Sequence, residues 1–404
     1  MTTAYSPCMM EPISDTPLIY KRTVVLLPGF DPRGASHYRK MLTTQFEKYA
    51  ERKNSRVETT PRKRWKKHWH RWNITAEKSR VSFLYCEWDD IIRKHWHRGR
   101  FELFLDSCRT YATYLSSLRF IMGCSSTSYS QIGFYYPLVT FLLLYLSLMS
   151  AAGTAAWYLA KFYQLPALGV SACVTAAILL AMLLAHNISP RLNGSWILRI
   201  FCFTKKIATE GIADWEKRVP ILASDLAAEM NDDPPDELLF VGHSVGAIKA
   251  IPVLKELLYH SSYTGRVSYM AIGQCMQLVT YLEKNDGKFN QSLRSVAEHP
   301  RLDWVDFTMP SDGACIALQD PVRAALNPPP NYPNPDSPKF LSPRFMEGYT
   351  KERYKELKRD HFEYHFQYYM TPDMAAEFEF AAIVLEDMPL AKRFANRENQ
   401  ARNR

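Results

Sequence analysis

Short runs of apolar and β-branched residues recur along the chain, and segments of helical or loop character separate them. The runs at residues 23–27, 81–85, 238–241, 267–272 and 304–308 predict five strands. Because these strands alternate with helical segments, we expect an α/β fold: a mostly parallel sheet with helices on both faces. In such a sheet, functional groups gather at the carboxyl ends of the strands.

Two longer runs, at residues 137–160 and 167–185, carry no charged side chain, and only six residues separate them. Each run is close to the roughly 20 residues that cross a bilayer, so the pattern predicts a transmembrane helical hairpin that interrupts the sheet. A pair of buried core helices and an interfacial hairpin are the alternatives.

Positive charge predicts the orientation of this hairpin, because basic residues favour the cytoplasmic flanks of membrane spans. The short connection holds one lysine, whereas several cations flank the pair on its outer sides: Arg119, Arg191, Arg199, Lys205 and Lys206. We therefore expect an inner-membrane, multi-pass protein whose catalytic domain is cytoplasmic.

Residues 62–72 alternate cations with tryptophans and contain no acid. The pattern is compatible with contact to a membrane surface, with a solvated charged loop and with nucleic-acid binding. The predicted hairpin favours lipid, so no nucleic-acid partner is expected. The His-Trp-His triplets at His68/His70 and His95/His97 lack a third ligand at a familiar spacing, so no metal site is predicted.

Composition narrows the class of protein further. The 404 residues are 47% hydrophobic, which supports a large folded core. The eight cysteines include no C-x-x-C pair and suggest neither a zinc site nor a disulfide framework. The net charge of +9 fits an anionic membrane or nucleic acid. The first twenty residues show no cleavable secretory signal.

The pentapeptide Gly-His-Ser-Val-Gly at residues 242–246 directly follows the apolar run 238–241, and a helix-compatible segment at 247–259 follows it. A Gly-x-Ser-x-Gly turn between a strand and a helix is typical of the nucleophile elbow of serine hydrolases. Ser244 is therefore the predicted nucleophile; a small residue in an ordinary tight turn is the alternative. Pro252 is expected to bend or shorten the helix.

An oxyanion hole requires two backbone N–H donors near the nucleophile. The apolar run that ends in Pro28, Gly29 and Phe30 predicts a strand followed by an oxyanion loop. We expect the amides of Phe30 and of Val245, which follows the nucleophile, to supply the donors. An ordinary turn at Pro28 and Gly29 is the alternative.

A triad acid lies beyond a strand end, in a loop. Asp312 meets this condition, whereas Asp306 lies inside the predicted strand, Asp303 precedes it and Asp320 is farther along the chain. Capping of a turn is the alternative role for Asp312.

The general base is expected to be a histidine downstream of the acid. His361 and His365 are four residues apart and would share one helix face, so spacing does not separate them. A structural histidine among aromatic side chains is the alternative role for either.

The order of oxyanion loop, nucleophile, acid and histidine resembles the α/β-hydrolase fold. The segments Gly-Phe-Asp-Pro-Arg-Gly at 29–34, Trp-Asp-Asp-Ile-Ile-Arg at 88–93 and His-Phe-Gln-Tyr at 365–368 are similar to those of a bacterial family of membrane-embedded α/β hydrolases of undefined substrate. The resemblance covers nearly the whole chain and implies that His365 is the base.

The sequence thus predicts a membrane-anchored serine hydrolase of the esterase or lipase type that cleaves a lipophilic acyl ester through Ser244, His365 and Asp312. An acyltransferase with the same triad and a non-catalytic membrane scaffold are the alternatives. No nucleotide motif or cofactor is expected, and no oligomeric state is predicted.

The predicted organisation has four parts. Residues 1–130 hold the oxyanion loop and the basic tryptophan-rich segment, 131–190 the hairpin, 191–390 the nucleophile, acid and histidine, and 391–404 a basic tail expected to fray. The proline-rich residues 327–343 are expected to form an extended loop that covers the site.

Overall fold

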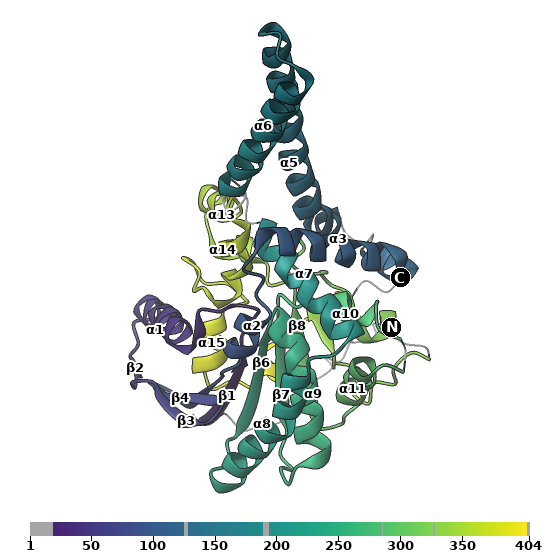
Figure 1. Cartoon of the computed structure of the whole chain (residues 1–404). Coiled ribbons are helices and arrows are strands. Elements are labelled where there is room, and N and C mark those ends of the chain that lie inside the picture. Colours follow the sequence, from purple (N-terminus) through teal and green to yellow (C-terminus); the bar gives the residue numbers. More distant parts are fainter. Residues whose placement is uncertain (1–18, 125–127, 189–193, 285, 326–327, 402–404) are drawn as a thin grey trace, which may run out of the picture.

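The computed structural model describes residues 19–124, 128–188, 194–284, 286–325 and 328–401 (Figure 1). Its centre is a nine-stranded sheet in the order β2-β4-β5-β1-β6-β7-β8-β9, with β3 paired to β4. The strands are β1 (Lys21–Leu27), β2 (Val57–Thr59), β3 (Lys63–Lys66), β4 (Trp69–Ala76), β5 (Arg80–Cys86), β6 (Glu237–His243), β7 (Val267–Ile272), β8 (Leu302–Phe307) and β9 (Lys339–Leu341).

The sheet is mixed. Strands β5, β1, β6, β7, β8 and β9 are parallel to one another. On the other side of β5, β4 is antiparallel to it, and β2 and β3 are each antiparallel to β4. The prediction of a mostly parallel sheet is therefore wrong. The five predicted strands correspond to β1, β5, β6, β7 and β8. The prediction missed β2, β3 and β4 because they are short or have polar residues between their apolar ones, so none forms a continuous apolar run.

The basic tryptophan-rich segment supplies two of these antiparallel strands. Along β4, buried and more exposed side chains alternate over much of the strand, as expected for a strand with one covered face. The rings of Trp69 and Trp72 are fully buried, and Trp72 stacks on Phe83 at a centroid distance of 4.6 Å. These two tryptophans belong to the core, and most of the segment forms strands and not the solvated loop that was one of the alternatives.

Helices cover both faces of the sheet (Figure 1). One apolar core lies under α1 and α14 to α16, and the other lies under α2, α3 and α7 to α11. The helices are α1 (Gly34–Arg52), α2 (Asp89–Lys94), α3 (Arg100–Ser116), α4 (Leu118–Cys124), α5 (Ser128–Phe162), α6 (Ala167–Ile188), α7 (Gly194–Thr209), α8 (Ala213–Asp232), α9 (Val245–His260), α10 (Gln277–Thr280), α11 (Lys288–Ala297), α12 (Pro321–Ala325), α13 (Lys351–Leu357), α14 (His361–His365), α15 (Phe380–Leu385) and α16 (Leu390–Arg393), with short 3₁₀ turns η2 (Phe345–Gly348) and η3 (Gln367–Tyr369).

Helices α5 and α6 pack against each other and project from the rest of the molecule as an antiparallel pair (Figure 1). The pair exposes several large apolar side chains, namely Leu143, Leu146, Trp157, Tyr158, Leu159, Phe162, Leu168, Leu179 and Leu180. The sequence thus located this helical hairpin.

Across the described residues, no helix combines the length and the apolarity that a membrane crossing requires. The transmembrane hairpin is therefore a wrong prediction, and so are the multi-pass topology and the inner-membrane location that depended on it. The prediction rested on the absence of charged residues, but uncharged residues are not all hydrophobic. Helix α5 contains Ser147, Ser150, Gly153 and Thr154, whose side chains contribute little to transfer into lipid. Helix α6 also contains Gly169, Ser171 and Thr175, whose side chains contribute little to transfer into lipid.

The carboxyl-terminal part of the chain is more ordered than expected. The proline-rich stretch contains β9, which extends the sheet beside β8; residue 327 lies outside the described residues. Beyond α16, the amide of Gln400 donates to the carbonyl of Phe340, and the Asn399 side chain accepts from the amide of Phe340. The tail is thus held on β9 up to residue 401. Helix α9 continues through Pro252 to His260, so the proline does not shorten it.

Candidate active site

Ser244 occupies the turn between β6 and α9 in a backbone conformation that side-chain-bearing residues rarely adopt, with φ 53° and ψ −125°. The Ser244 amide donates to the carbonyl of Ile272 at the end of β7, and its carbonyl accepts from the amide of Ala247. Such strain persists only where the surroundings enforce it and is concentrated at functional sites. This is the geometry of a nucleophile elbow.

The two glycines of the pentapeptide permit a close approach of strand, helix and oxyanion loop. A Cβ atom on Gly246 would lie 2.1 Å from the carbonyl oxygen of Leu27 and 2.4 Å from that of Pro28. A Cβ atom on Gly242 would lie 2.6 Å from Cα of Ala247. Since backbone atoms form these contacts, no side-chain rotation relieves them, and only glycine fits.

The loop after β1 lies directly against the nucleophile. A Cβ atom on Gly29 would be 3.3 Å from Cβ of Ser244. Phe30 follows Gly29, and Val245 is the first residue of α9, a position whose N–H has no acceptor within its own helix. Asp31 and Arg33 form an ion pair of 2.7 Å within this loop. The predicted donors thus lie on the two segments that meet at Ser244.

Asp312 and His365 are paired in the interior. Nδ1 of His365 lies 2.8 Å from Oδ2 of Asp312, although 53 residues separate them in sequence. Oδ2 also accepts the hydroxyl of Tyr368 at 3.1 Å, and Oδ1 accepts the amide of Ala314 at 3.0 Å. A carboxylate with these donors fixes the orientation of the imidazole and leaves Nε2 as the nitrogen available for proton transfer.

His365 lies beside the strand ends that carry the nucleophile. A Cβ atom on Gly273, the residue after β7, would be 3.1 Å from Cε1 of His365. The neighbouring residue to Ser244, His243, places Nε2 3.1 Å from the carbonyl oxygen of His365. Burial lowers the pKa of His243 well below its ordinary value, so this second histidine is neutral.

The nucleophile and the base do not form a hydrogen bond in this structure. Nε2 of His365 is buried without a hydrogen-bond partner among the described residues. The Ser244 hydroxyl lies beside the Cys275 thiol: burial raises the pKa of this thiol to about 12, and the hydroxyl partly offsets that effect. Catalytic hydrogen bonds are often long before substrate binds, so the absence of this bond does not exclude Ser244 and His365 as a candidate pair.

The site is enclosed. Ser244, Asp312 and His365 expose 2%, 3% and 1% of their surfaces, respectively. The indole of Trp196, in α7, lies 5.5 Å from the His365 ring and 4.9 Å from the Phe362 ring. Aromatic rings thus pack directly beside His365.

The other candidates from the sequence lie elsewhere. His361, the alternative base, is exposed at the first residue of α14. Asp306 points into the core from β8, Asp303 pairs with Arg266 at 2.5 Å, and Asp320 accepts the hydroxyl of Tyr332. Only His365 and Asp312 lie together at the nucleophile.

Three residues near the site were absent from the sequence-based predictions. Tyr368 lies three residues after His365 and supports Asp312. Cys275 and Trp196 contact Ser244 and His365, respectively, but belong to no motif, so no local signal in the sequence could have identified them.

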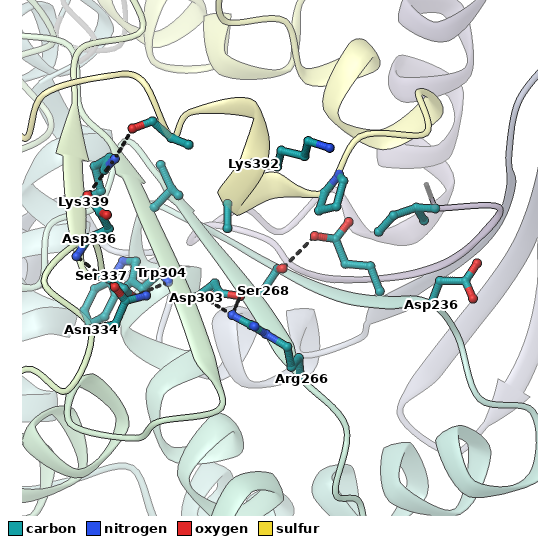
Figure 2. A pocket seen from close by; sticks show the side chains of 16 residues that line it. Asp236, Arg266, Ser268, Asp303, Trp304, Asn334, Asp336, Ser337, Lys339 and Lys392 are labelled. Carbon is teal, nitrogen blue, oxygen red and sulfur yellow. Dashed lines mark hydrogen bonds and ion pairs between the residues drawn. The ribbon is translucent and has the colours of Figure 1, made fainter. Parts of the chain in front are cut away.

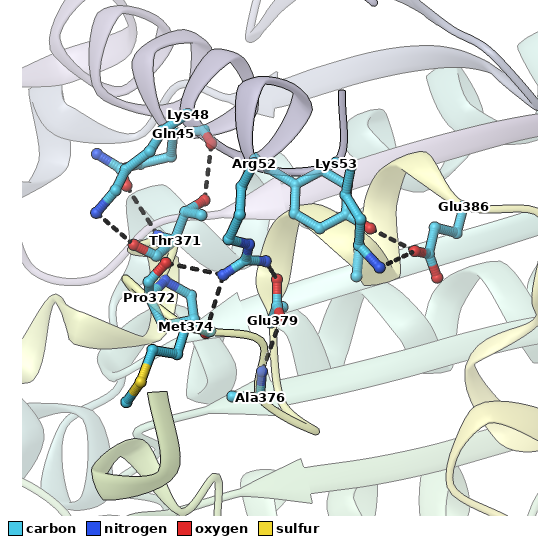
Figure 3. Close-up of polar contacts among 12 residues, drawn as sticks. Gln45, Lys48, Arg52, Lys53, Thr371, Pro372, Met374, Ala376, Glu379 and Glu386 are labelled. Atoms are coloured by element: carbon cyan, nitrogen blue, oxygen red, sulfur yellow. Dashed lines mark hydrogen bonds and ion pairs between the residues drawn. The ribbon is translucent and has the colours of Figure 1, made fainter. Parts of the chain in front are cut away.

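A cluster of polar contacts fastens the segment after the histidine to the end of α1 (Figure 3). Arg52 forms an ion pair with Glu379 and donates to the carbonyl oxygens of Pro372 and Met374. The side chain of Gln45 accepts the amide of Thr371 at 2.8 Å. Since this segment follows α14 and η3, the cluster fixes the end of the element that carries His365.

A cavity of about 690 Å³ lies at the opposite end of the sheet (Figure 2). Its polar side chains are paired with one another: Ser268 donates to Glu237, and Arg266 pairs with Asp303. The cavity lies at the amino ends of β7 and β8, whereas Ser244 lies beyond the carboxyl end of β6. We therefore assign it no part in the chemistry of the triad.

Comparison with known proteins gives no match: no protein-family description fits the chain, and no curated protein and no solved structure is significantly similar to it.

Proposed function

We propose that the chain is a serine hydrolase that cleaves an acyl ester. The observation that carries the proposal is the buried 2.8 Å contact between Asp312 and His365 beside the strained turn at Ser244. The order of oxyanion loop, nucleophile, acid and histidine also resembles that of the α/β-hydrolase fold.

The proposed reaction follows from the positions of these groups. Oγ of Ser244 attacks the acyl carbon while Nε2 of His365 takes its proton, and Asp312 stabilises the imidazolium that forms. The amides of Phe30 and Val245 donate to the oxyanion, each contributing about 3 to 4 kcal/mol. His365 then protonates the leaving alcohol, and water releases the acid from the acyl-enzyme.

The surroundings of the triad favour an apolar substrate. The rings of Trp196 and Phe366 lie beside His365. Among the described residues, the charged group stacked on these aromatic rings is Arg33, which lies over Phe362 and Phe366 and is paired with Asp31. A lipophilic acyl ester is thus the substrate class that we propose.

Hydrolysis of a short-chain aryl ester tests the proposal. We expect Ser244→Ala and His365→Ala each to lower kcat by about 1,000-fold or more, because a triad acts as a unit. His361→Ala is the matched control: this histidine is exposed, and its loss should leave kcat within about twofold. No turnover by the native chain, or an equal loss in the His361 and His365 variants, would contradict the proposal.

A further inference from the structure

Lys249 is a buried cation that lacks a partner. It lies one turn into α9, exposes 3% of its surface, and forms no hydrogen bond or ion pair with the described residues. Its Nζ lies 5.2 Å from the ring centroid of Phe203 and 5.6 Å from that of Trp215. Ring faces attract a cation but neutralise no charge. A buried ammonium normally has a carboxylate beside it, and here that partner is missing.

The side chain borders a cavity of about 380 Å³ enclosed by the end of α7, by α8, by α9 and by the start of α11. Most of the wall is apolar and is formed by Ile207, Ile212, Val219, Ile248, Pro252 and Phe289. Among the described lining residues, Lys249 is thus the buried, unpaired amine beside this apolar wall, whereas Lys288 is exposed and paired with Glu216.

The acidic side chains of this cavity have other partners. Glu216 pairs with Lys288 at 3.3 Å, and Glu210 pairs with lysines of α7. Glu283 accepts two backbone amides at the start of α11. His95 also lies near Lys249, and its pKa is lowered by burial and by lysines that include Lys249. None of the described acids neutralises Lys249.

We propose that this cavity binds a monocarboxylate with a compact apolar body, whose carboxylate pairs with the ammonium of Lys249 while its apolar part contacts the hydrophobic wall. A single negative charge fits best, because Glu216 and Glu283 repel a dianion. The proposal goes beyond the hydrolase reaction and depends on no property of Ser244.

Proton uptake is a specific consequence of this arrangement. Burial lowers the pKa of Lys249 to about 7, against a weaker opposing effect of Glu216. A bound carboxylate raises this pKa, because it stabilises the ammonium form. At pH 8, where most of the free amine is neutral, binding of a carboxylate should therefore take up a proton, and binding of a neutral ligand should not.

Calorimetric titration of the full chain with octanoate and with 1-octanol tests the proposal. We expect octanoate to bind at least about tenfold more tightly than 1-octanol, with proton uptake at pH 8 seen as an enthalpy that depends on the buffer. Lys249→Met should weaken octanoate binding at least about tenfold and leave 1-octanol unaffected. Lys288→Met, at an exposed lysine of the same cavity, should stay within about threefold of the native affinity.

Three outcomes would overturn the proposal: no octanoate binding, equal affinity for the two ligands, or native affinity in Lys249→Met. Thermal unfolding of both variants shows whether they are folded, and removal of a buried amine is not expected to lower the unfolding temperature.

Discussion

The buried side chain of Asp306 should make the free energy of unfolding depend on pH. It lies within β8 and is fully buried; the side chains of Gln274 and Trp304 lie beside its carboxyl group and weakly favour the ionised form, but neither completes a well-formed hydrogen bond to it. Burial, reinforced by the nearby Asp320, raises its pKa well above the ordinary value. The native state therefore retains a proton that the unfolded chain releases near pH 4.

The sign and size of the effect follow from this difference in protonation. Between pH 4 and the raised pKa, the folded state binds one more proton than the unfolded state, so the free energy of unfolding falls as pH rises, by up to about 1.4 kcal/mol per pH unit. Asp306→Asn removes the titrating group. The stability of this variant relative to the native chain should therefore rise with pH above about 4, by up to about 1.4 kcal/mol per pH unit for as long as the pH stays below the raised pKa.

Urea denaturation of both chains at several pH values measures this difference. Asp286→Asn, at an exposed acid, is the control and should follow the native pH dependence. If the difference between Asp306→Asn and the native chain does not change with pH, Asp306 is ionised in the folded state and the reasoning from its burial is refuted.

Three further predictions concern the triad and its supports. Asp312→Asn should lower kcat for an aryl ester by about 1,000-fold or more, because the imidazole loses its acceptor at Nδ1; a loss below about tenfold would refute this role. Gly246→Ala should destabilise the chain by about 1 to 3 kcal/mol in urea denaturation, because the added Cβ atom meets backbone oxygens. Gly153→Ala, where the nearest atom to an added Cβ would be 3.7 Å away, should be neutral or slightly stabilising. Equal effects of the two substitutions would contradict the crowding argument. Arg52→Met should lower the free energy of unfolding by about 3 to 5 kcal/mol, because it removes the ion-pair partner of the buried Glu379 carboxylate. Lys48→Met, which breaks an exposed ion pair, should lower it by only about 0 to 1 kcal/mol. A similar small loss in both variants would show that Arg52 does not fix the segment after His365.

Local patterns were the part of the structure that the sequence predicted best. The apolar runs of β1, β6 and β7 are buried on both faces, and such strands leave a near-continuous hydrophobic signature. The turn at Ser244 is also local, because the two glycines and the serine that create it are adjacent in sequence.

Composition was a weaker guide. Cations beside tryptophans in residues 62–72 suggested a surface. In fact Trp69 and Trp72 lie on opposite faces of β4, and each ring is buried in the core on its own side of the sheet, while Arg71 between them pairs with Glu229. Uncharged runs in α5 and α6 suggested a membrane, although alanine, glycine and hydroxyl side chains carry little hydrophobic free energy.

Long-range packing decided what spacing could not. His361 and His365 are equivalent by helical periodicity, yet one is exposed and the other is buried against Asp312, because η3 and the contacts of Arg52 fix the orientation of this segment. The enclosing Trp196 comes from α7, more than 160 residues before His365 in the sequence shown. The catalytic role of His365 stays a prediction that the esterase assay tests.

Reaction with a fluorophosphonate probe tests the central claim most directly. We predict that the native chain reacts with one equivalent of probe, that the modified peptide contains Ser244, and that Ser244→Ala remains unlabelled while Asp306→Asn is labelled like the native chain. Absence of Ser244-dependent labelling in the folded native chain would contradict the account of this site as a serine hydrolase.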